Sequence, residues 1–110
     1  MVKPVAGEVV VIPFPRTDVS GGKRRPALVI EDLPGADLIL CQITSRAHHD
    51  AFSVPLDSSD FDRGQLGQQS FIRPQRLFTL EHRIILHSVG KVTAEKFDEV
   101  FKRVRELFVD

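Results

Sequence analysis

Two short runs of aliphatic, largely β-branched residues, separated by a polar segment, set the strongest limit on the fold of this chain. Residues 9–12 read Val-Val-Val-Ile, and residues 26–30 read Pro-Ala-Leu-Val-Ile. Runs of this kind, bounded by proline or glycine, are typical of strands buried in a sheet. Residues 18–22 lie between them and supply an aspartate, a serine and two glycines, which favour a turn. We therefore expect two interior strands, the first over residues 7–12, joined by a polar loop.

Three consecutive cations, Lys23, Arg24 and Arg25, lie where this loop meets the second strand. A guanidinium held at the start of a rigid strand can bind a phosphate through two parallel hydrogen bonds, while a glycine-containing loop moves to admit the ligand. A solvated cationic turn is the alternative interpretation, because short basic runs are common in surface loops. The spacing alone leaves both interpretations open.

The balance of charge narrows the classes of function. The chain has 110 residues with 15 cations and 15 anions, which excludes a protein that coats nucleic acid through its overall field. Residues 1–30 nevertheless carry five cations and two anions, whereas residues 31–72 carry two cations and seven anions. Any nucleic-acid binding must come from this local excess of positive charge. With 42% hydrophobic residues, the chain is expected to form one domain over residues 1–110.

The single cysteine, Cys41, lies in the apolar run of residues 38–43. It has no partner for an intramolecular disulfide, and its setting predicts a core residue rather than a nucleophile. The sequence shows no signal peptide, no apolar run of about 18 residues and no lipidation motif. We expect a cytoplasmic protein without a membrane partner.

The rest of the chain reads as short strands followed by one helix. Pro13 and Pro15 are expected to end the first strand, a loop-rich stretch is expected over residues 57–69, and further strands are expected over residues 38–44, 51–56, 70–73, 75–79 and 84–91. Thr93 is positioned to cap a helix. Six apolar residues with helical spacing indicate that helix: Phe97, Val100, Phe101, Val104, Leu107 and Phe108. Short strands, no helical crossover and one terminal helix predict a mainly β fold, a strongly bent antiparallel sheet or small barrel.

Several short motifs occur in an order that resembles a known family. The series runs Gly-Glu-Val-Val at 7–10, Gly-Gly at 21–22, Arg-Pro-Ala-Leu-Val-Ile at 25–30, Ile-Thr-Ser at 43–45, Ser-Phe-Ile-Arg at 70–73 and Leu-Phe-Thr-Leu at 77–80. It resembles the MazF/PemK/Kid family, the toxins of type II toxin-antitoxin systems. The resemblance implies an SH3-like small antiparallel β-barrel of the Kid/PemK/CcdB type with a C-terminal helix, which forms homodimers.

The same resemblance implies a function. Members look like metal-independent, sequence-specific endoribonucleases, or mRNA interferases, which need no cofactor and cut single-stranded RNA. The 2′-hydroxyl attacks the adjacent phosphorus and leaves a 2′,3′-cyclic phosphate and a 5′-hydroxyl end. This chemistry needs a proton acceptor, a proton donor for the leaving oxygen and a group that stabilises charge on the phosphate. The implied partners are messenger RNA and a cognate antitoxin protein.

Two residues are expected to be catalytic. Arg25 matches the family's arginine before proline and can stabilise charge on the phosphate in the transition state. Thr44 matches the family's active-site threonine, whose hydroxyl can donate to a phosphate oxygen. The alternatives are an arginine that braces the loop through a carboxylate and an ordinary strand threonine. Substrate contacts are expected from Lys23, Arg24, Ser45, Arg46, Arg73, Phe14 and Ser20.

Position 75 departs from the family's pattern. Arg73 matches an arginine that one branch uses as a proposed proton donor, and that branch's aspartate two residues later is Gln75 here. A neutral amide does not accept a proton at physiological pH, so the mechanism does not transfer unchanged, and Arg73 is expected to contact a phosphate or a base. His48 or His49 could serve as acid or base, with exposed loop histidines as the alternative. A metal site at residues 48–50 lacks a fourth ligand.

Two other functions stay open. A toxin of the related CcdB fold that binds DNA gyrase would not need an arginine and a hydroxyl that converge on phosphate, so Arg25 and Thr44 favour the nuclease. A non-catalytic RNA-binding or regulatory barrel is the second alternative, and Gln75 keeps it open.

Overall fold

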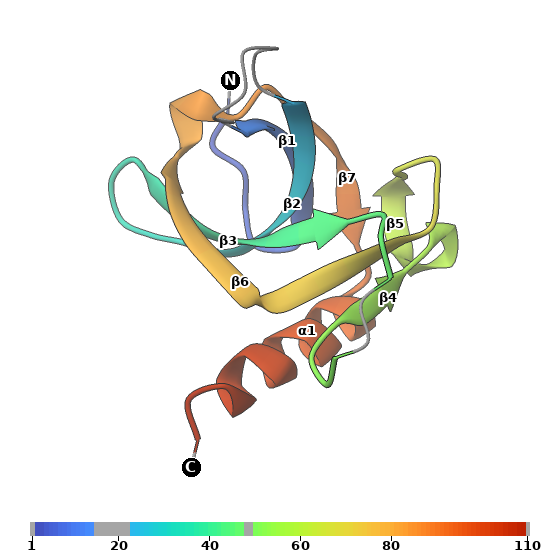
Figure 1. Cartoon of the computed structure of the whole chain (residues 1–110). Helices are drawn as coiled ribbons and strands as arrows, with labels where there is room; N and C mark the ends of the chain where they lie inside the picture. Colours follow the sequence, from blue (N-terminus) through green and yellow to red (C-terminus); the bar gives the residue numbers. More distant parts are fainter. Residues whose placement is uncertain (1, 15–22, 48–49, 110) are drawn as a thin grey trace.

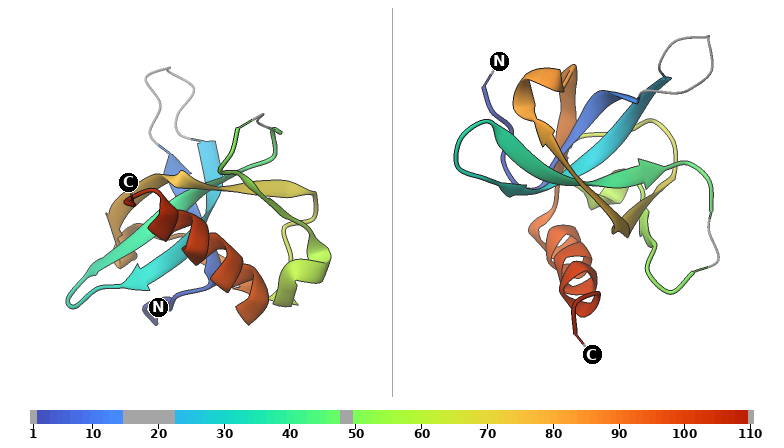
Figure 2. Two further views of the ribbon diagram at one scale, coloured as in Figure 1. Left: turned by 90° about the horizontal axis from the view of Figure 1, so that it is seen from below. Right: turned by 60° about the vertical axis from the view of Figure 1, so that its left-hand side comes forward.

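The computed structural model describes residues 2–14, 23–47 and 50–109. Its elements, in chain order, are β1 (Glu8–Phe14), β2 (Lys23–Asp32), β3 (Asp37–Thr44), β4 (Val54–Leu56), the 3₁₀ turn η1 (Ser58–Asp60), β5 (Phe61–Gly64), β6 (Ser70–Glu81), the 3₁₀ turn η2 (His82–Ile84), β7 (His87–Val92) and α1 (Ala94–Glu106). The strands form one antiparallel sheet in the order β4-β6-β3-β2-β1-β7-β5. The sheet curls into a half-barrel, and α1 packs against one of its faces (Figures 1 and 2). The predicted fold class is confirmed.

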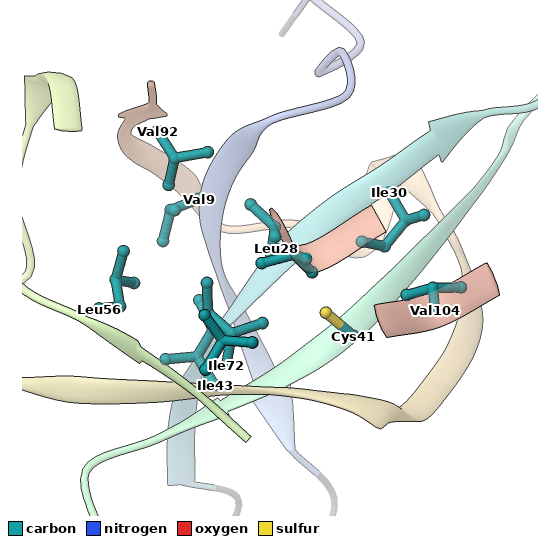
Figure 3. Packing of buried hydrophobic residues seen from close by; sticks show 11 residues of the cluster. Val9, Leu28, Ile30, Cys41, Ile43, Leu56, Ile72, Val92 and Val104 are labelled. Carbon is teal, nitrogen blue, oxygen red and sulfur yellow. The ribbon is translucent and has the colours of Figure 1, made fainter. Parts of the chain in front are cut away.

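The core lies on both faces of the three central strands. Because side chains of a strand alternate between faces, each strand contributes to two clusters. The cluster beneath α1 is drawn in Figure 3 and includes Val9, Leu28, Cys41, Ile43, Ile72, Val100 and Val104. The cluster on the opposite face includes Val10, Ile12, Ala27, Val29, Leu38, Leu40 and Ile85. Cys41 is fully buried, which raises its pKa well above the ordinary value and confirms it as a core residue.

β1 and β2 correspond to the two β-branched runs of the sequence. They pair from Val9 opposite Leu28 to Phe14 opposite Lys23. β7 covers the other side of β1 over residues 8–11, and no strand within the described ranges pairs with Pro13 on that side. A residue without an N–H is tolerated at such a position. β1 therefore runs two residues beyond its predicted end.

β6 corrects the prediction of two separate strands over residues 70–73 and 75–79. Gln42 pairs with Arg73, and the next pair joins Cys41 to Leu77, so residues 74–76 bulge out of the ladder. Pro74 lies in this bulge, where its missing N–H costs no ladder hydrogen bond. The strand then resumes, and its total length is 12 residues.

β5 corrects the prediction of a loop over residues 57–69. It is an edge strand that pairs with β7, with Gly64 opposite Gly90. Gly64 has a φ angle of +74°, and a Cβ at this position would lie 1.9 Å from the carbonyl oxygen of Val89, so a larger residue does not fit. The strand predicted over residues 51–56 shortens to β4, and the one predicted over 84–91 begins as η2 and becomes β7.

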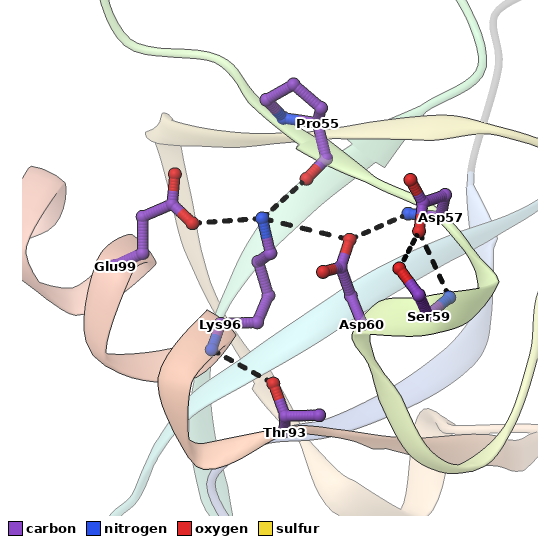
Figure 4. Close-up of polar contacts among 7 residues, drawn as sticks. All are labelled: Pro55, Asp57, Ser59, Asp60, Thr93, Lys96 and Glu99. Carbon is purple, nitrogen blue, oxygen red and sulfur yellow. Dashed lines mark hydrogen bonds and ion pairs between the residues drawn. The ribbon is translucent and has the colours of Figure 1, made fainter.

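The start of α1 is fastened to the sheet by side chains. The Thr93 hydroxyl accepts a hydrogen bond from the Lys96 backbone N–H at 3.1 Å, which confirms the predicted cap. Lys96 Nζ donates to the Glu99 carboxylate at 2.9 Å and to the Pro55 carbonyl at 3.0 Å, and it lies 3.8 Å from the Asp60 carboxylate (Figure 4). Within the described ranges, no helix has the length and apolar character needed to cross a membrane.

Candidate functional site

A pocket lies at the ends of β2 and β3, next to the segment that joins β5 to β6. Its volume is about 270 Å³, and the residues that line it are Arg24, Arg25, Pro26, Ile43, Thr44, Ser45, Leu66, Gln68 and Ser70. The structure thus brings together four of the predicted site residues, namely Arg24, Arg25, Thr44 and Ser45. Two cations and three hydroxyls around one small cavity suit an anionic ligand.

Strand pairing explains why Arg25 and Thr44 share this pocket. The β2–β3 ladder runs as far as the pair Ala27–Gln42. Continuing that antiparallel register two residues along each strand brings Arg25 level with Thr44. Pro26, which has no backbone N–H, stands where the ladder stops and the pocket begins. Arg25 remains paired with β1 on its other side, so its backbone belongs to the rigid sheet.

The hydroxyl of Thr44 is oriented by the chain that follows it. Thr44 is 8% exposed, and its Oγ1 accepts a hydrogen bond from the backbone N–H of Arg46 at 3.1 Å. A hydroxyl that accepts one hydrogen bond still has its own proton to donate. Thr44 can therefore donate to an anionic oxygen in the pocket. Arg46 supplies this backbone contact, and its side chain is exposed and does not line the pocket, so a substrate contact by that side chain stays a prediction.

Arg73 lines a second cavity of about 410 Å³. The residues around it are Ile12, Pro13, Gln42, Arg73, Arg76, Leu77, Phe78 and Leu80. Arg73 pairs with Gln42 across β3 and β6, and Phe71 pairs with Thr44. Arg73 and Thr44 are thus diagonal neighbours on one face of the sheet, an arrangement in which long side chains can still reach one another. Thr44 lines the smaller cavity and Arg73 lines the larger one, so the structure does not bring Arg73 into the smaller cavity.

A carboxylate stands beside Arg73. Asp50 Oδ2 lies 3.7 Å from the terminal guanidinium nitrogen of Arg73 and 3.4 Å from Nε2 of Gln75. Hydrogen bonds from the backbone N–H groups of Ser53 and Phe52 lower the pKa of Asp50 to about 2. The carboxylate is therefore ionised throughout the neutral pH range and is a poor proton acceptor there.

Four polar residues of these cavities were missed by sequence reasoning, among them Arg76, which lines the larger cavity. Gln68 and Ser70 help to close the smaller pocket, and the Ser70 hydroxyl, in a residue only 2% exposed, donates to the Gln68 carbonyl at 3.3 Å. Gln42 lines the larger cavity from the middle of β3. An amide inside an apolar strand is a signal that could have indicated Gln42. No local signal marks Gln68, which reaches the pocket through the connection between β5 and β6.

The remaining predicted residues belong to parts of the chain that are described partly or not at all. Ser20, His48 and His49 lie outside the described residues. Phe14 and Lys23 pair with each other at the ends of β1 and β2, and this backbone pairing is what the structure describes of them. Over residues 2–14, 23–47 and 50–109, no group of three or more His, Cys, Asp or Glu side chains could hold a metal ion.

A curled seven-stranded sheet, a terminal helix and a cationic pocket at the strand ends define a small β half-barrel with an anion-suited site. Residues 6–108 match the family described as "PemK-like, MazF-like toxin of type II toxin-antitoxin system". The chain belongs to this family, as the order of its motifs indicated.

Solved structures show the same fold. The chain is 27% identical to a chain of the MazE-MazF crystal structure (Form-III) from Deinococcus radiodurans, with a TM-score of 0.78 over 96% of each chain. It is 26% identical to MazF (Form-I) from the same organism, with a TM-score of 0.75 over 97% of each chain. An endoribonuclease in complex with its cognate antitoxin from Mycobacterial species is 16% identical, with a TM-score of 0.72 over 94% of this chain and 92% of that chain, a likeness of fold alone. Comparison with curated protein sequences gives no match.

Proposed function

We propose that this chain is an endoribonuclease toxin that cleaves single-stranded RNA without a metal ion. The observation that carries the proposal is the pocket that Arg25 and Thr44 share, within a chain of the MazF/PemK family. The described residues that line this pocket include no carboxylate and no imidazole. Its cations and hydroxyls are suited to stabilising negative charge on a phosphate.

The reaction uses the chemistry of RNA itself. The 2′-hydroxyl attacks the adjacent phosphorus, the bond to the 5′-oxygen breaks, and a 2′,3′-cyclic phosphate and a 5′-hydroxyl remain. Negative charge grows on the non-bridging phosphate oxygens in the transition state, where the Arg25 guanidinium stabilises it more than in the ground state. The Thr44 hydroxyl supplies a further donor, and Arg24 and Ser45 bind the strand on either side. DNA lacks the 2′-hydroxyl and would not be cut.

The relatives support a proposal about partners. The Deinococcus radiodurans crystal structure contains MazE together with MazF, and the mycobacterial endoribonuclease is in complex with its cognate antitoxin. We infer that this chain acts in the cytoplasm as a homodimer, and that an acidic or extended segment of a cognate antitoxin inhibits it by occupying the cationic pocket.

A non-catalytic RNA-binding barrel is the second candidate. It is favoured by Gln75, which offers a neutral amide where an acidic residue would be needed to accept a proton, and by the low pKa of the nearby Asp50. Both candidates bind RNA, and only the first cuts it.

Incubation with a long single-stranded RNA in excess EDTA tests the proposal. The wild-type protein should give sequence-restricted cuts with 5′-hydroxyl ends and leave DNA of the same sequence intact. Arg25→Ala and Thr44→Ala should each lower the rate about 10²–10³-fold, the usual effect of removing a donor to a developing oxyanion. Arg83→Ala is the control, because Arg83 is exposed on η2 and lines neither cavity. Uncut RNA with a folded wild-type protein would exclude the nuclease and favour the binding barrel.

A further inference from the structure

The two oxygens of the Asp50 carboxylate make different sets of contacts. Oδ1 accepts hydrogen bonds from the backbone N–H groups of Phe52 at 2.8 Å and Ser53 at 2.7 Å. Oδ2 accepts from the Ser53 hydroxyl at 3.1 Å and from the Gln75 amide at 3.4 Å, and it lies 3.7 Å from the Arg73 guanidinium. Oδ1 thus builds the turn that leads into β4, and Oδ2 faces two side chains of β6, the strand beside β4 (Figure 1).

The polar ends of Arg73 and Gln75 have few other contacts. The Arg73 side chain is 13% exposed, so water satisfies little of it. Arg73 Nε and Gln75 Oε1 are buried, and neither atom has a hydrogen-bond partner in the part of the chain that the structure describes. Among the described residues, Asp50 is the one that forms an ion pair with Arg73. Its Oδ2 is therefore the contact that locates both side chains.

The location of Arg73 affects the site. Arg73 lines the larger cavity together with Arg76, whereas Asp50 is absent from the lining of both cavities. Arg73 is also the last residue paired with β3 before the bulge of residues 74–76 interrupts the ladder. A shift of its guanidinium would change the larger cavity, whose Arg73 is the diagonal neighbour of Thr44 in the smaller pocket.

We propose that Asp50 is a positioning residue, whose Oδ2 holds the Arg73 guanidinium where it receives a phosphate of an RNA strand that continues from the smaller pocket into the larger cavity. This inference rests on the RNA binding that the proposed function requires, and not on cleavage. Asp50 acts through Arg73 and does not itself touch RNA. An ion pair at 3.7 Å with a partly exposed carboxylate is weak, so it orients the guanidinium and leaves its donors available to a phosphate.

Asp50→Asn separates the two tasks of the carboxylate. Asparagine keeps a carbonyl oxygen that can accept from Phe52 and Ser53, so the turn survives. Its NH₂ group replaces Oδ2. Because this group is a donor, it cannot accept hydrogen bonds from Arg73 and Gln75. The Kd for 2′-O-methyl RNA of mixed sequence, which cannot be cleaved, should rise about 10-fold, as expected for the loss of one contact to a charged group. Asp57→Asn is the matched control, because Asp57 also caps a turn, through the Ser59 N–H at 3.0 Å, and lines neither cavity.

A double-mutant cycle tests whether Asp50 acts through Arg73. In the Arg73→Ala background, Asp50→Asn should cause no further rise in Kd, because the side chain that Asp50 positions is gone. Gln75→Glu in the Asp50→Asn background places a carboxylate at position 75 in place of the one lost at position 50. The double variant has the same net charge as the wild type. This pair of substitutions should restore most of the affinity, which repair of a turn alone would not do.

Each outcome decides between the two proposals. Wild-type affinity in Asp50→Asn, a further loss on top of Arg73→Ala, or no rescue by Gln75→Glu would overturn the role of Asp50, whatever the cleavage assay shows. If the wild-type protein leaves RNA uncut but the Kd values of the variants follow the expected cycle, the nuclease is refuted and the positioning role is retained. A wild-type protein that binds no RNA would refute both.

Discussion

Lys96 and Arg73 are two cations that are nearly equally buried but differ in how many polar partners surround them. Their side chains are 12% and 13% exposed. Lys96 donates to a carboxylate at 2.9 Å and to a carbonyl at 3.0 Å, and a second carboxylate lies at 3.8 Å (Figure 4). Among the described residues, Arg73 has one carboxylate at 3.7 Å and a buried Nε without a partner. Burial alone therefore does not tell which cation stabilises the fold.

The difference between these cations reflects two regions of the molecule. Where α1 meets β4 and η1, polar side chains find their partners within the protein, as buried polar groups of a stable core must. At the ends of β2 and β3 and along β6, cations and hydroxyls line cavities. The buried Nε of Arg73, which has no partner among the described residues, marks a place where a ligand can complete the contacts. We expect substitutions in the first region to change stability and those in the second to change RNA binding.

The largest change in stability is expected for Lys96→Met. It removes two hydrogen bonds and leaves the Asp60 and Glu99 carboxylates without their cation, so the free energy of unfolding should fall by about 2 kcal/mol. Urea denaturation measures this, with Lys102→Met, an exposed cation of the same helix, as the control. Cleavage per folded molecule should stay at the wild-type level. If Lys96→Met and Lys102→Met were equally stable, Lys96 would not be a structural cation, and it would not differ from Arg73 in this respect.

Arg73→Met should show the opposite pattern. Methionine fills much of the same volume and removes a buried Nε donor that has no partner in the described part of the chain, so the free energy of unfolding should change by less than about 1 kcal/mol. The Kd for 2′-O-methyl RNA should rise about 10-fold, because one phosphate contact is lost. A stability loss as large as that of Lys96→Met would show that Arg73 is a structural cation.

The smallest effect is expected in the pH dependence of stability. The turn lowers the pKa of Asp50 from 3.8 to about 2, so the ionised group stabilises the fold above about pH 4, and this contribution is lost as the pH falls towards 2. The difference in unfolding free energy between wild type and Asp50→Asn should therefore shrink over that range. Urea denaturation at several pH values measures it. A difference that stays constant with pH would show that ionisation of Asp50 is not linked to folding.

The elements that sequence reasoning predicted well are those determined by local contacts. All residues of the runs at 9–12 and 26–30 except Val11 and Pro26 are buried at the centre of the sheet, because β-branched side chains pack well on a pleated surface. Thr93 caps α1 through a bond that spans three residues. The strands that carry Arg25 and Thr44 were likewise indicated by local pattern, although it is the β2–β3 register that places both residues at one pocket.

The elements that it missed depend on partners far along the chain. β5 has four residues and is a strand because β7 pairs with it, a contact that no short window contains. The extra residues at the bulge in β6 are visible only from the register against β3. The Gln75 amide meets Asp50 across 25 positions of sequence, and nothing local to either residue indicates that contact.

The sequence by itself determined the family, the mainly β fold with its terminal helix, and the strands that carry Arg25 and Thr44, because hydrophobic patterning and capping act over a few residues. Only the tertiary structure decided that Arg73 lines a separate cavity and that Asp50 stands beside it. Side chains from distant strands and turns come together through strand register and the curl of the sheet. These depend on the packing of the whole core rather than on any one segment.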